Sequence, residues 1–223
     1  MREQFIICLA VFALCLPATV AQNSGNAVLP APTTNQIALP PPNVSGGMSL
    51  TQALVARRSV RSFLPTPLTK AELSRILWAA QGMTDKEGHR TTPSAGAQYY
   101  IHVYAASADG FFEYMPSGHQ LQKLSDKDLR SKLSAQQSVN QAPTVLLIAG
   151  EYGRATDKYG QERGPRFVNL EAGHIAQNVL LQAVALELSA VPVGGVEPKA
   201  AQRVASLPAQ YGAIYLIPVG HPK

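Results

Sequence analysis

The chain has only two cysteines among its 223 residues, and both lie near the start, at Cys8 and Cys15. A mature chain without this region has no thiol, which excludes disulfides, thiolate zinc sites and cysteine-held iron–sulfur clusters. The five histidines lack a ligand-like spacing, so we expect no metal site. The Gly-x-Ser-x-Gly setting of a hydrolase and a glycine-rich phosphate loop ending in Gly-Lys are also missing.

The sequence also lacks a run long enough to span a bilayer comfortably, since a spanning helix needs roughly 20 apolar residues. The run from Phe5 to Leu16 lies between Arg2 and the small residues of "PATVAQ". This layout is typical of a secretory signal. We therefore expect residues 1–21 to be a signal peptide, with no stable membrane anchor, and the protein to be exported to the periplasm or secreted.

A net charge of +5 indicates affinity for anions, yet lysine and arginine are scattered along the chain and no aromatic residues interleave with a basic stripe. This pattern argues against nucleic-acid binding. Residues 22–47 are rich in Asn, Ser, Pro and Gly and are expected to be a flexible Pro-rich linker. The remaining residues, 48–223, suit one domain with a substantial core.

Local patterns predict strands interspersed with helices, without a regular βαβ rhythm, within this domain. The capping boxes "SLTQ" at 49–52 and "TKAE" at 69–72 each begin a helix. The residues after the second box are expected to remain helical until Gly82. Apolar and β-branched runs predict strands at 98–106, 110–115, 142–152 and 212–220, the first two as a hairpin and the third buried. Further helices are expected at 125–137, 167–188 and 198–208, with a charged loop at 153–167. His174, on the long helix, is expected to be a core histidine. The order of these helices and strands predicts an α+β layered domain.

The stretch "RRSVR" holds Arg57, Arg58, Ser59 and Arg61. It is either a solvated helix end or a phosphate site, because guanidinium forks and a serine hydroxyl suit phosphate oxygens. On a helix, at most two of these arginines could face one ligand.

Two other segments also allow two interpretations. In "TTPSAGAQ", Ser94, Ala95 and Gly96 form either an ordinary turn or a tight backbone whose amides contact a planar polar ligand. In "VPVGGV", Gly194 and Gly195 form either a plain loop or a place where a ring approaches the backbone without a Cβ in the way.

The order of these segments resembles the FMN-dependent nitroreductase family, and more closely its branch of SagB-type dehydrogenase-like domains. The resemblance rests on "RRSVRSF", "RTTPSAGAQYYIHVY", "EAGHIAQNVLLQAVALELSAVPVGG" and "YLIPVGHP", which together extend from about Ser49 to Pro222. It implies a nitroreductase-like layered sandwich in which helices flank a central, mostly antiparallel sheet. It further implies a homodimer that holds FMN in two clefts at the subunit interface.

By this resemblance, Arg57 would contact the flavin phosphate, Arg58 and Ser59 the phosphate or ribityl region, and Arg61 the pyrimidine edge. Ser94, Ala95 and Gly96 would come from the partner subunit, and Gly194 with Gly195 would lie beside the reactive N5 of the ring. A cation at the pyrimidine edge stabilises reduced flavin.

The chain departs from the family pattern in two places. Glu187 and Ser189 stand where related sequences usually carry glycine. The chain stops at Lys223, where many members continue with basic residues, so a thinner phosphate clamp is expected.

The expected function is an exported FMN-dependent oxidoreductase that transfers two electrons between flavin N5 and a small organic substrate. A peptide azoline dehydrogenase remains an alternative, as does a non-catalytic dimeric binding module that has lost the flavin.

Overall fold

The computed structural model describes residues 35–223, and the expected signal peptide lies outside them. The strands are β1 (Gln36–Ala38), β2 (Ile101–Ser107), β3 (Gly110–Met115), β4 (Gln120–Ser125), β5 (Thr144–Glu151), β6 (Ser189–Ala190) and β7 (Tyr211–Gly220). The helices are α1 (Leu50–Ala56), α2 (Lys70–Gln81), α3 (Arg130–Leu133), α4 (Gln137–Gln141), α5 (Tyr152–Ala185) and α6 (Pro198–Val204), with a single 3-10 turn, η1, at Ala95–Ala97.

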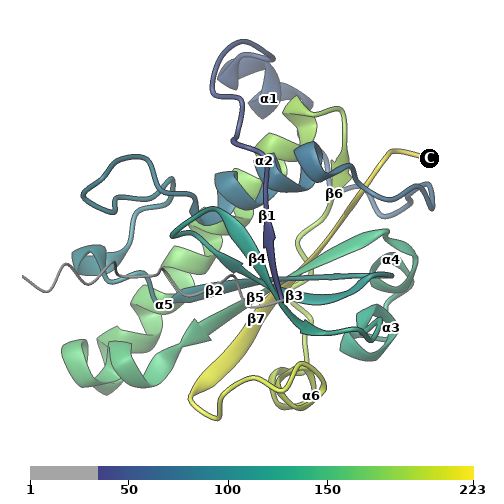
Figure 1. The fold of residues 1–223 in the computed structure, drawn as a ribbon. Coiled ribbons are helices and arrows are strands. Elements are labelled where there is room, and N and C mark those ends of the chain that lie inside the picture. The colour runs from purple at the N-terminus through teal and green to yellow at the C-terminus, as the bar shows by residue number, and fades with distance from the viewer. Residues whose placement is uncertain (1–34) are drawn as a thin grey trace, which may run out of the picture. The chain divides into compact units, whose positions relative to one another are not determined.

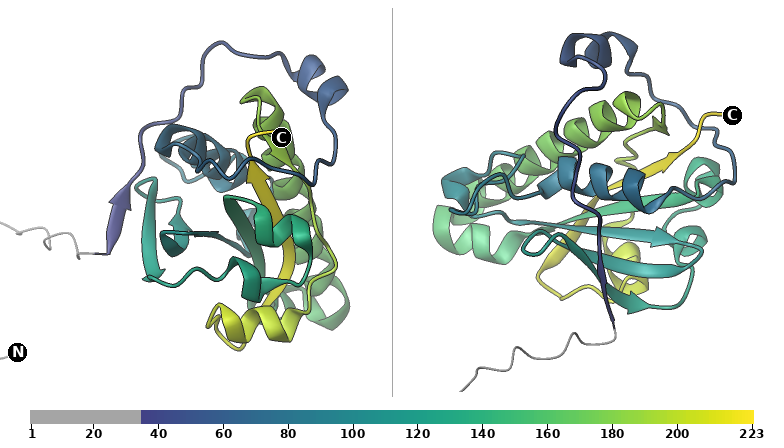
Figure 2. Two further views of the ribbon diagram at one scale, coloured as in Figure 1. Left: turned by 90° about the vertical axis from the view of Figure 1, so that its right-hand side faces the viewer. Right: turned by 45° about the horizontal axis from the view of Figure 1, so that its top comes forward.

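The strands form one sheet in the order β1-β4-β3-β2-β5-β7-β6, and every neighbouring pair is antiparallel. Helices α2 and α5 cover one face of this sheet, whereas α3, α4 and α6 lie toward the other (Figures 1 and 2). The predicted α+β sandwich with a central antiparallel sheet flanked by helices is therefore confirmed.

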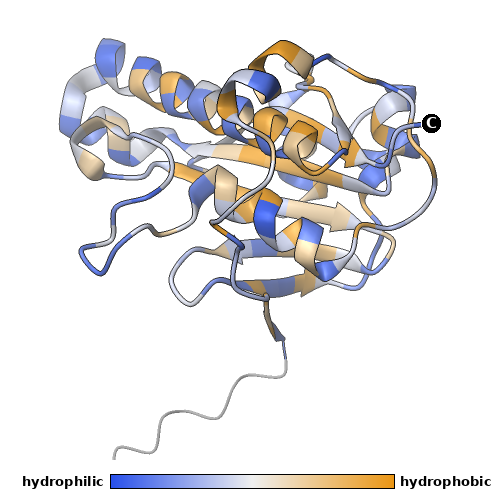
Figure 3. Ribbon diagram, turned by 90° about the horizontal axis from the view of Figure 1, so that it is seen from above, coloured by the Kyte–Doolittle hydropathy of each residue, from blue (hydrophilic) through white to orange (hydrophobic). Residues whose placement is uncertain are grey.

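Strand β5 is the centre of the core, and its side chains alternate between two apolar layers. Leu146 and Ile148 pack on the side of α2 and α5. Val145 and Leu147 pack on the side of α3, α4 and α6. A strand covered on both faces needs apolar residues at every position, which is why its sequence is a continuous run instead of an alternation. The central strands are accordingly hydrophobic along their length (Figure 3).

Both capping boxes form as predicted. The side chains of Ser49 and Thr69 accept from the backbone amides of Gln52 and Glu72. In return, the side chains of Gln52 and Glu72 accept from the backbone amides of the two cap residues. The α2 cap Gly82 is also confirmed. These local bonds satisfy amide groups that a helix start otherwise leaves without partners.

Several expectations about element boundaries are wrong. Residues 36–38 of the expected linker form strand β1 against β4. Strand β4 itself was not predicted, because "QLQKLS" contains no β-branched or aromatic residue that would mark it as a strand. Strand β6 was also missed, and the helix expected at 125–137 is two short helices, α3 and α4.

The long helix also differs from its prediction. Helix α5 begins at Tyr152, so the expected charged loop at 153–167 is helical apart from a break at Gly160, whose φ of 84° no ordinary residue favours. His174 is exposed instead of buried, because Glu171 and Ile175 occupy the inward face of that turn. One helical step of about 100° is enough to turn a side chain from core to solvent.

Candidate functional site

The arginine segment follows α1 directly and carries unpaired positive charge. Arg57 is half-buried, whereas Arg58, Ser59 and Arg61 are exposed. Arg58 donates from Nη1 to the carbonyl oxygens of Val55 and Arg57, both at 2.8 Å. Within residues 35–223, no carboxylate lies in ion-pair distance of the three guanidinium groups. Cations concentrated in this way suit a doubly negative phosphate.

The arginine segment and the glycine loop converge at one edge of the sheet. Ser59 forms a parallel bridge with Ala190 of β6, and the Val60 amide donates to the Ala190 carbonyl at 3.2 Å. Directly after β6, Val193 pairs with Leu216 of β7. The chain thus brings together two segments that are more than a hundred residues apart in sequence.

The glycine pair at this edge leaves an open backbone face. Gly194 and Gly195 are exposed, and neither has a positive φ. A Cβ at Gly194 would approach the Tyr215 ring no closer than 3.5 Å, an ordinary contact, and one at Gly195 would meet only the flexible end of Gln136, at 3.3 Å. Because the chain's own packing does not demand glycine here, the open face fits the close approach of a flat ligand.

The Ser94 segment is held in an unusual backbone conformation by its own chain. Gly96, Ala97 and Tyr99 all have positive φ, between 51° and 60°. The Ser94 hydroxyl donates to a carboxylate oxygen of Glu171 at 2.6 Å and accepts from the Tyr99 amide at 2.8 Å. The Ser94 hydroxyl therefore already donates its hydrogen bond within the chain. The backbone around Gly96 is the part of this segment that can contact a ligand.

Within one chain, the Ser94 segment is not joined to the other two. The Ser94 hydroxyl bonds to Glu171 on α5, whereas the backbone at Ser59 and Val60 pairs with Ala190 of β6. A cavity of about 600 Å³ includes Gly195 with Gln136 and Glu197, but neither the arginines nor Ser94 line it. The family resemblance implies that Ser94, Ala95 and Gly96 of a second subunit would complete a site with the other two segments.

Glu171 is a site-forming residue that the sequence analysis missed. Its side chain is only 2% exposed on α5. Its carboxylate accepts hydrogen bonds from the Gln81 amide, the Ser94 hydroxyl and the backbone amides of Tyr100 and Ile101. The available signal was a single acidic residue within an otherwise apolar helix stripe, a position where a charge is stable only when several donors surround it.

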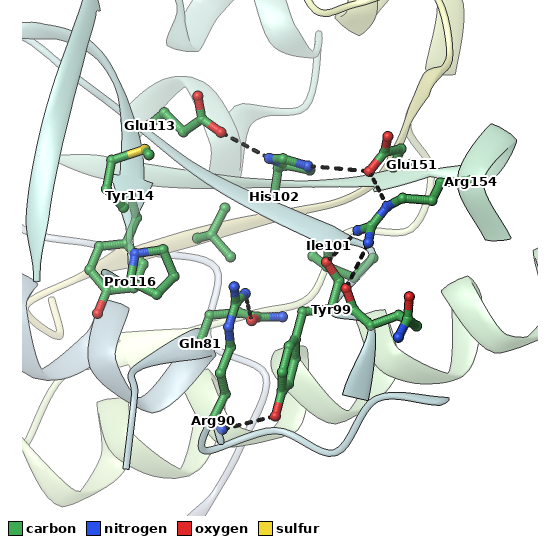
Figure 4. A pocket seen from close by; sticks show the side chains of 13 residues that line it. Gln81, Arg90, Tyr99, Ile101, His102, Glu113, Tyr114, Pro116, Glu151 and Arg154 are labelled. Atoms are coloured by element: carbon green, nitrogen blue, oxygen red, sulfur yellow. Dashed lines mark hydrogen bonds and ion pairs between the residues drawn. The ribbon is translucent and has the colours of Figure 1, made fainter. Parts of the chain in front are cut away.

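A second cavity, of about 330 Å³, lies beside the same segment and was not expected from the sequence (Figure 4). On one side, Nη1 of Arg90 donates to the Gln81 side chain, and its guanidinium lies 4.3 Å from the centre of the Tyr99 ring. On another side, His102 Nδ1 lies 2.9 Å from a Glu113 oxygen. This cavity gathers charged and aromatic groups from the segment between α2 and β2, from β2 and β3, and from the junction of β5 with α5.

The described part of the chain contains no group of three or more His, Cys, Asp or Glu side chains that could hold a metal ion. Within residues 35–223, no helix combines the length and apolar character that crossing a bilayer requires.

Comparisons with known proteins agree on one family. The model of the Nitroreductase family matches residues 54–221. A provisionally assigned nitroreductase of Methanocaldococcus jannaschii is 42% identical over 157 residues, which cover 66% of this chain and 79% of that protein. A provisionally assigned nitroreductase from Ralstonia eutropha has a crystal structure with a TM-score of 0.81 at 32% identity, covering 85% of this chain and 90% of that one. The NADPH:FMN oxidoreductase from Vibrio harveyi, complexed with NAD+, has a TM-score of 0.59 at 19% identity over 78% of this chain and 69% of that one, and so shares the fold. The chain belongs to the Nitroreductase family.

Proposed function

We propose that this protein is an exported, homodimeric FMN-dependent oxidoreductase that transfers two electrons between flavin N5 and a small organic substrate. The observation that carries the proposal is the pairing of Ser59 with Ala190, which places the arginine segment against the start of the glycine loop. The family supplies the oxidoreductase class. A neighbour of the same fold is an NADPH:FMN oxidoreductase by name, which supports FMN as the cofactor.

The residues at this edge fit the cofactor by their chemistry. Arg57, Arg58 and Arg61 supply positive charge for the phosphate and the pyrimidine edge, and Arg58 is already oriented by two carbonyl oxygens. Gly194 and Gly195 leave backbone amides accessible without a Cβ in the way. When bound, FMN supplies reversible two-electron chemistry, and the protein supplies position and electric field.

The second subunit would complete the site. Helix α1 exposes Leu50 by 67%, Leu54 by 53% and Val55 by 70%. Exposed apolar side chains gathered on one short helix mark an interaction surface. A second copy of this chain would cover them and would bring its own Ser94, Ala95 and Gly96 toward the arginines of the first.

The dimer is tested with Leu54→Glu, since a charge buried in an apolar interface is strongly unfavourable. Light scattering should report a dimer for the wild type and a monomer for this variant. Leu124→Glu, at a 47% exposed position on β4, is the matched control and should stay dimeric. A wild type that is monomeric at working concentration would refute the shared site.

The cofactor is tested on the mature protein purified from its native compartment. It should be yellow, with flavin absorption that bleaches on anaerobic reduction. Arg57→Ala should lose the flavin while circular dichroism shows an intact fold, whereas Arg203→Ala, on the exposed side of α6, should keep it. Colourless protein that ignores added FMN would support instead a binding module that has lost the flavin.

Export has a chemical consequence for the electron donor. NAD(P)H is not expected outside the cytoplasm, so we propose a different reductant, or oxidation of the substrate with onward transfer of electrons. Fractionation of expressing cells tests the location, and anaerobic titration with candidate donors tests the reductant. Membership of the SagB-type branch stays a prediction, and azoline peptides belong among the substrates tried.

A further inference from the structure

The cavity beside Arg90 exists because two neighbouring strands separate. Strands β2 and β3 pair only as far as Tyr104 and Glu113. Beyond this point, β2 continues to Ile101 against β5, and β3 continues to Met115 against β4. A gap therefore opens between β2 and β3, and side chains from both strands, α2 and α5 line it (Figure 4). A volume of about 330 Å³ is at the lower end for small-molecule sites.

Arg90 brings to this cavity a positive charge that, among residues 35–223, has no direct ion-pair partner. Its side chain is half-buried, and its guanidinium contacts the neutral Gln81 amide and the Tyr99 ring. Within the described chain, no carboxylate lies in ion-pair distance of Arg90. Burial lowers the pKa of Arg90 even though Glu171 opposes this effect. A guanidinium in such a place is stabilised when a carboxylate replaces the lost water.

The other charged groups in the cavity are paired among themselves. Glu113 bonds to His102 at 2.9 Å. Arg154 binds Glu151 at 2.8 Å and also donates to the backbone carbonyls of Gln98 and Tyr99. In Figure 4, His102 lies between the two glutamates, away from Arg90. Arg90 is therefore the charged group in this cavity that lacks an opposite charge of its own.

Apart from Gln98, the rest of the lining is apolar or aromatic, with Ile101, Val103, Tyr114, Met115 and Pro116. Burial raises the pKa of Tyr114, which keeps its hydroxyl neutral. The cavity thus combines one cation, an aromatic ring beside it and an apolar wall. Such a combination recognises an acid group attached to a compact hydrophobic body.

We propose that this cavity binds a small organic carboxylate with an aromatic or aliphatic body, whose carboxylate pairs with Arg90. The planar guanidinium can donate two parallel hydrogen bonds to a carboxylate. None of the nine residues expected to hold the flavin lines the cavity. The proposed carboxylate site thus consists of other residues than the proposed flavin site, and its binding can be measured with and without added FMN.

The test is a calorimetric titration of the full mature chain with phenylacetate, and with phenylacetamide as its uncharged counterpart. Phenylacetate should bind saturably, and at least about tenfold more tightly than the amide, because hydrogen bonds to charged groups are roughly twice as strong as neutral ones. Arg90→Gln should abolish this preference, and Arg203→Gln should leave it unchanged. Arg90→Lys keeps the charge but loses the planar guanidinium that donates two parallel hydrogen bonds, and should bind with intermediate affinity.

Equal affinity for acid and amide would overturn the proposal, as would undiminished phenylacetate binding by Arg90→Gln. If Arg90→Gln fails to fold, the Arg90→Lys titration and a crystal structure of the wild-type complex decide the matter. In that structure, a carboxylate within hydrogen-bond distance of Arg90 supports the proposal, and phenylacetate bound only elsewhere refutes it.

Discussion

Replacing Glu171 with glutamine tests whether one buried carboxylate holds the Ser94 segment in place. Glu171 is almost fully buried, and each of its oxygens accepts two hydrogen bonds. Glutamine has nearly the same shape but only one acceptor oxygen, and its amide group can only donate. With the oxygen kept toward Gln81 and Ile101, the amide group would face the donors of Ser94 and Tyr100.

The size of the effect follows from these contacts. The bond from Ser94 is short, at 2.6 Å, and its acceptor is charged. Losing such a bond costs roughly 1.5 to 3 kcal/mol. The Tyr100 amide lies farther away, at 3.3 Å, and leaving a buried amide without a partner costs about 1 to 3 kcal/mol. Since the Ser94 hydroxyl can rotate to another acceptor, we expect a total loss of about 3 kcal/mol.

Denaturant unfolding measures this loss directly. The midpoint should fall while the slope stays constant, because the amount of surface exposed on unfolding does not change. A loss of 3 kcal/mol corresponds to a melting temperature lower by about 6 to 12 °C in a domain of this size. Glu162→Gln, at an exposed position on the same helix, is the control and should change stability by less than about 0.5 kcal/mol. If Glu171→Gln changes stability no more than this control, the carboxylate does not organise the segment.

Three further changes test other parts of the structure. Glu187 has a φ of 58° after α5. Glu187→Gly relieves a penalty of about 1 to 2 kcal/mol but adds about 0.5 to 1 kcal/mol of chain entropy. Thermal unfolding should therefore show between no change and about 1.5 kcal/mol of stabilisation, and a lower melting temperature would contradict this. In Gly82→Ala the new Cβ would overlap the ring of Trp78, so stability should fall by about 1 to 3 kcal/mol and the emission of this single tryptophan should shift to the red; unchanged emission would refute the contact. Burial lowers the pKa of His119, so at acid pH the unfolded chain binds more protons than the folded chain, and wild-type stability falls below about pH 6.5. Asparagine tolerates the positive φ at this position. In His119→Asn this part of the fall should therefore be absent when unfolding is compared at about pH 7.5 and pH 5.5.

The sequence predicted best those elements whose stability is local. The boxes at Ser49 and Thr69 satisfy amides within one helical turn, so four neighbouring residues contain all of the information. The hairpin of β2 and β3 and the buried strand β5 were found for a similar reason, because their apolar patterns follow directly from the faces that they cover. The family motifs pointed to the arginine and glycine segments as a flavin site, and this assignment stays a prediction.

The tertiary structure decided where these segments meet. The pairing of Ser59 with Ala190 joins positions separated by most of the domain, and no local pattern contains such a contact. The same holds for Glu171, whose donors come from α2, the Ser94 segment and the start of β2. Strand β1 depends on β4 for its hydrogen bonds, so its residues looked like linker when considered alone. The periodicity of the sequence shows which face of an element is covered, whereas long-range pairing depends on the folding of the whole chain. For the same reason, only the folded chain shows that Arg90 lines a cavity without an ion-pair partner among the described residues.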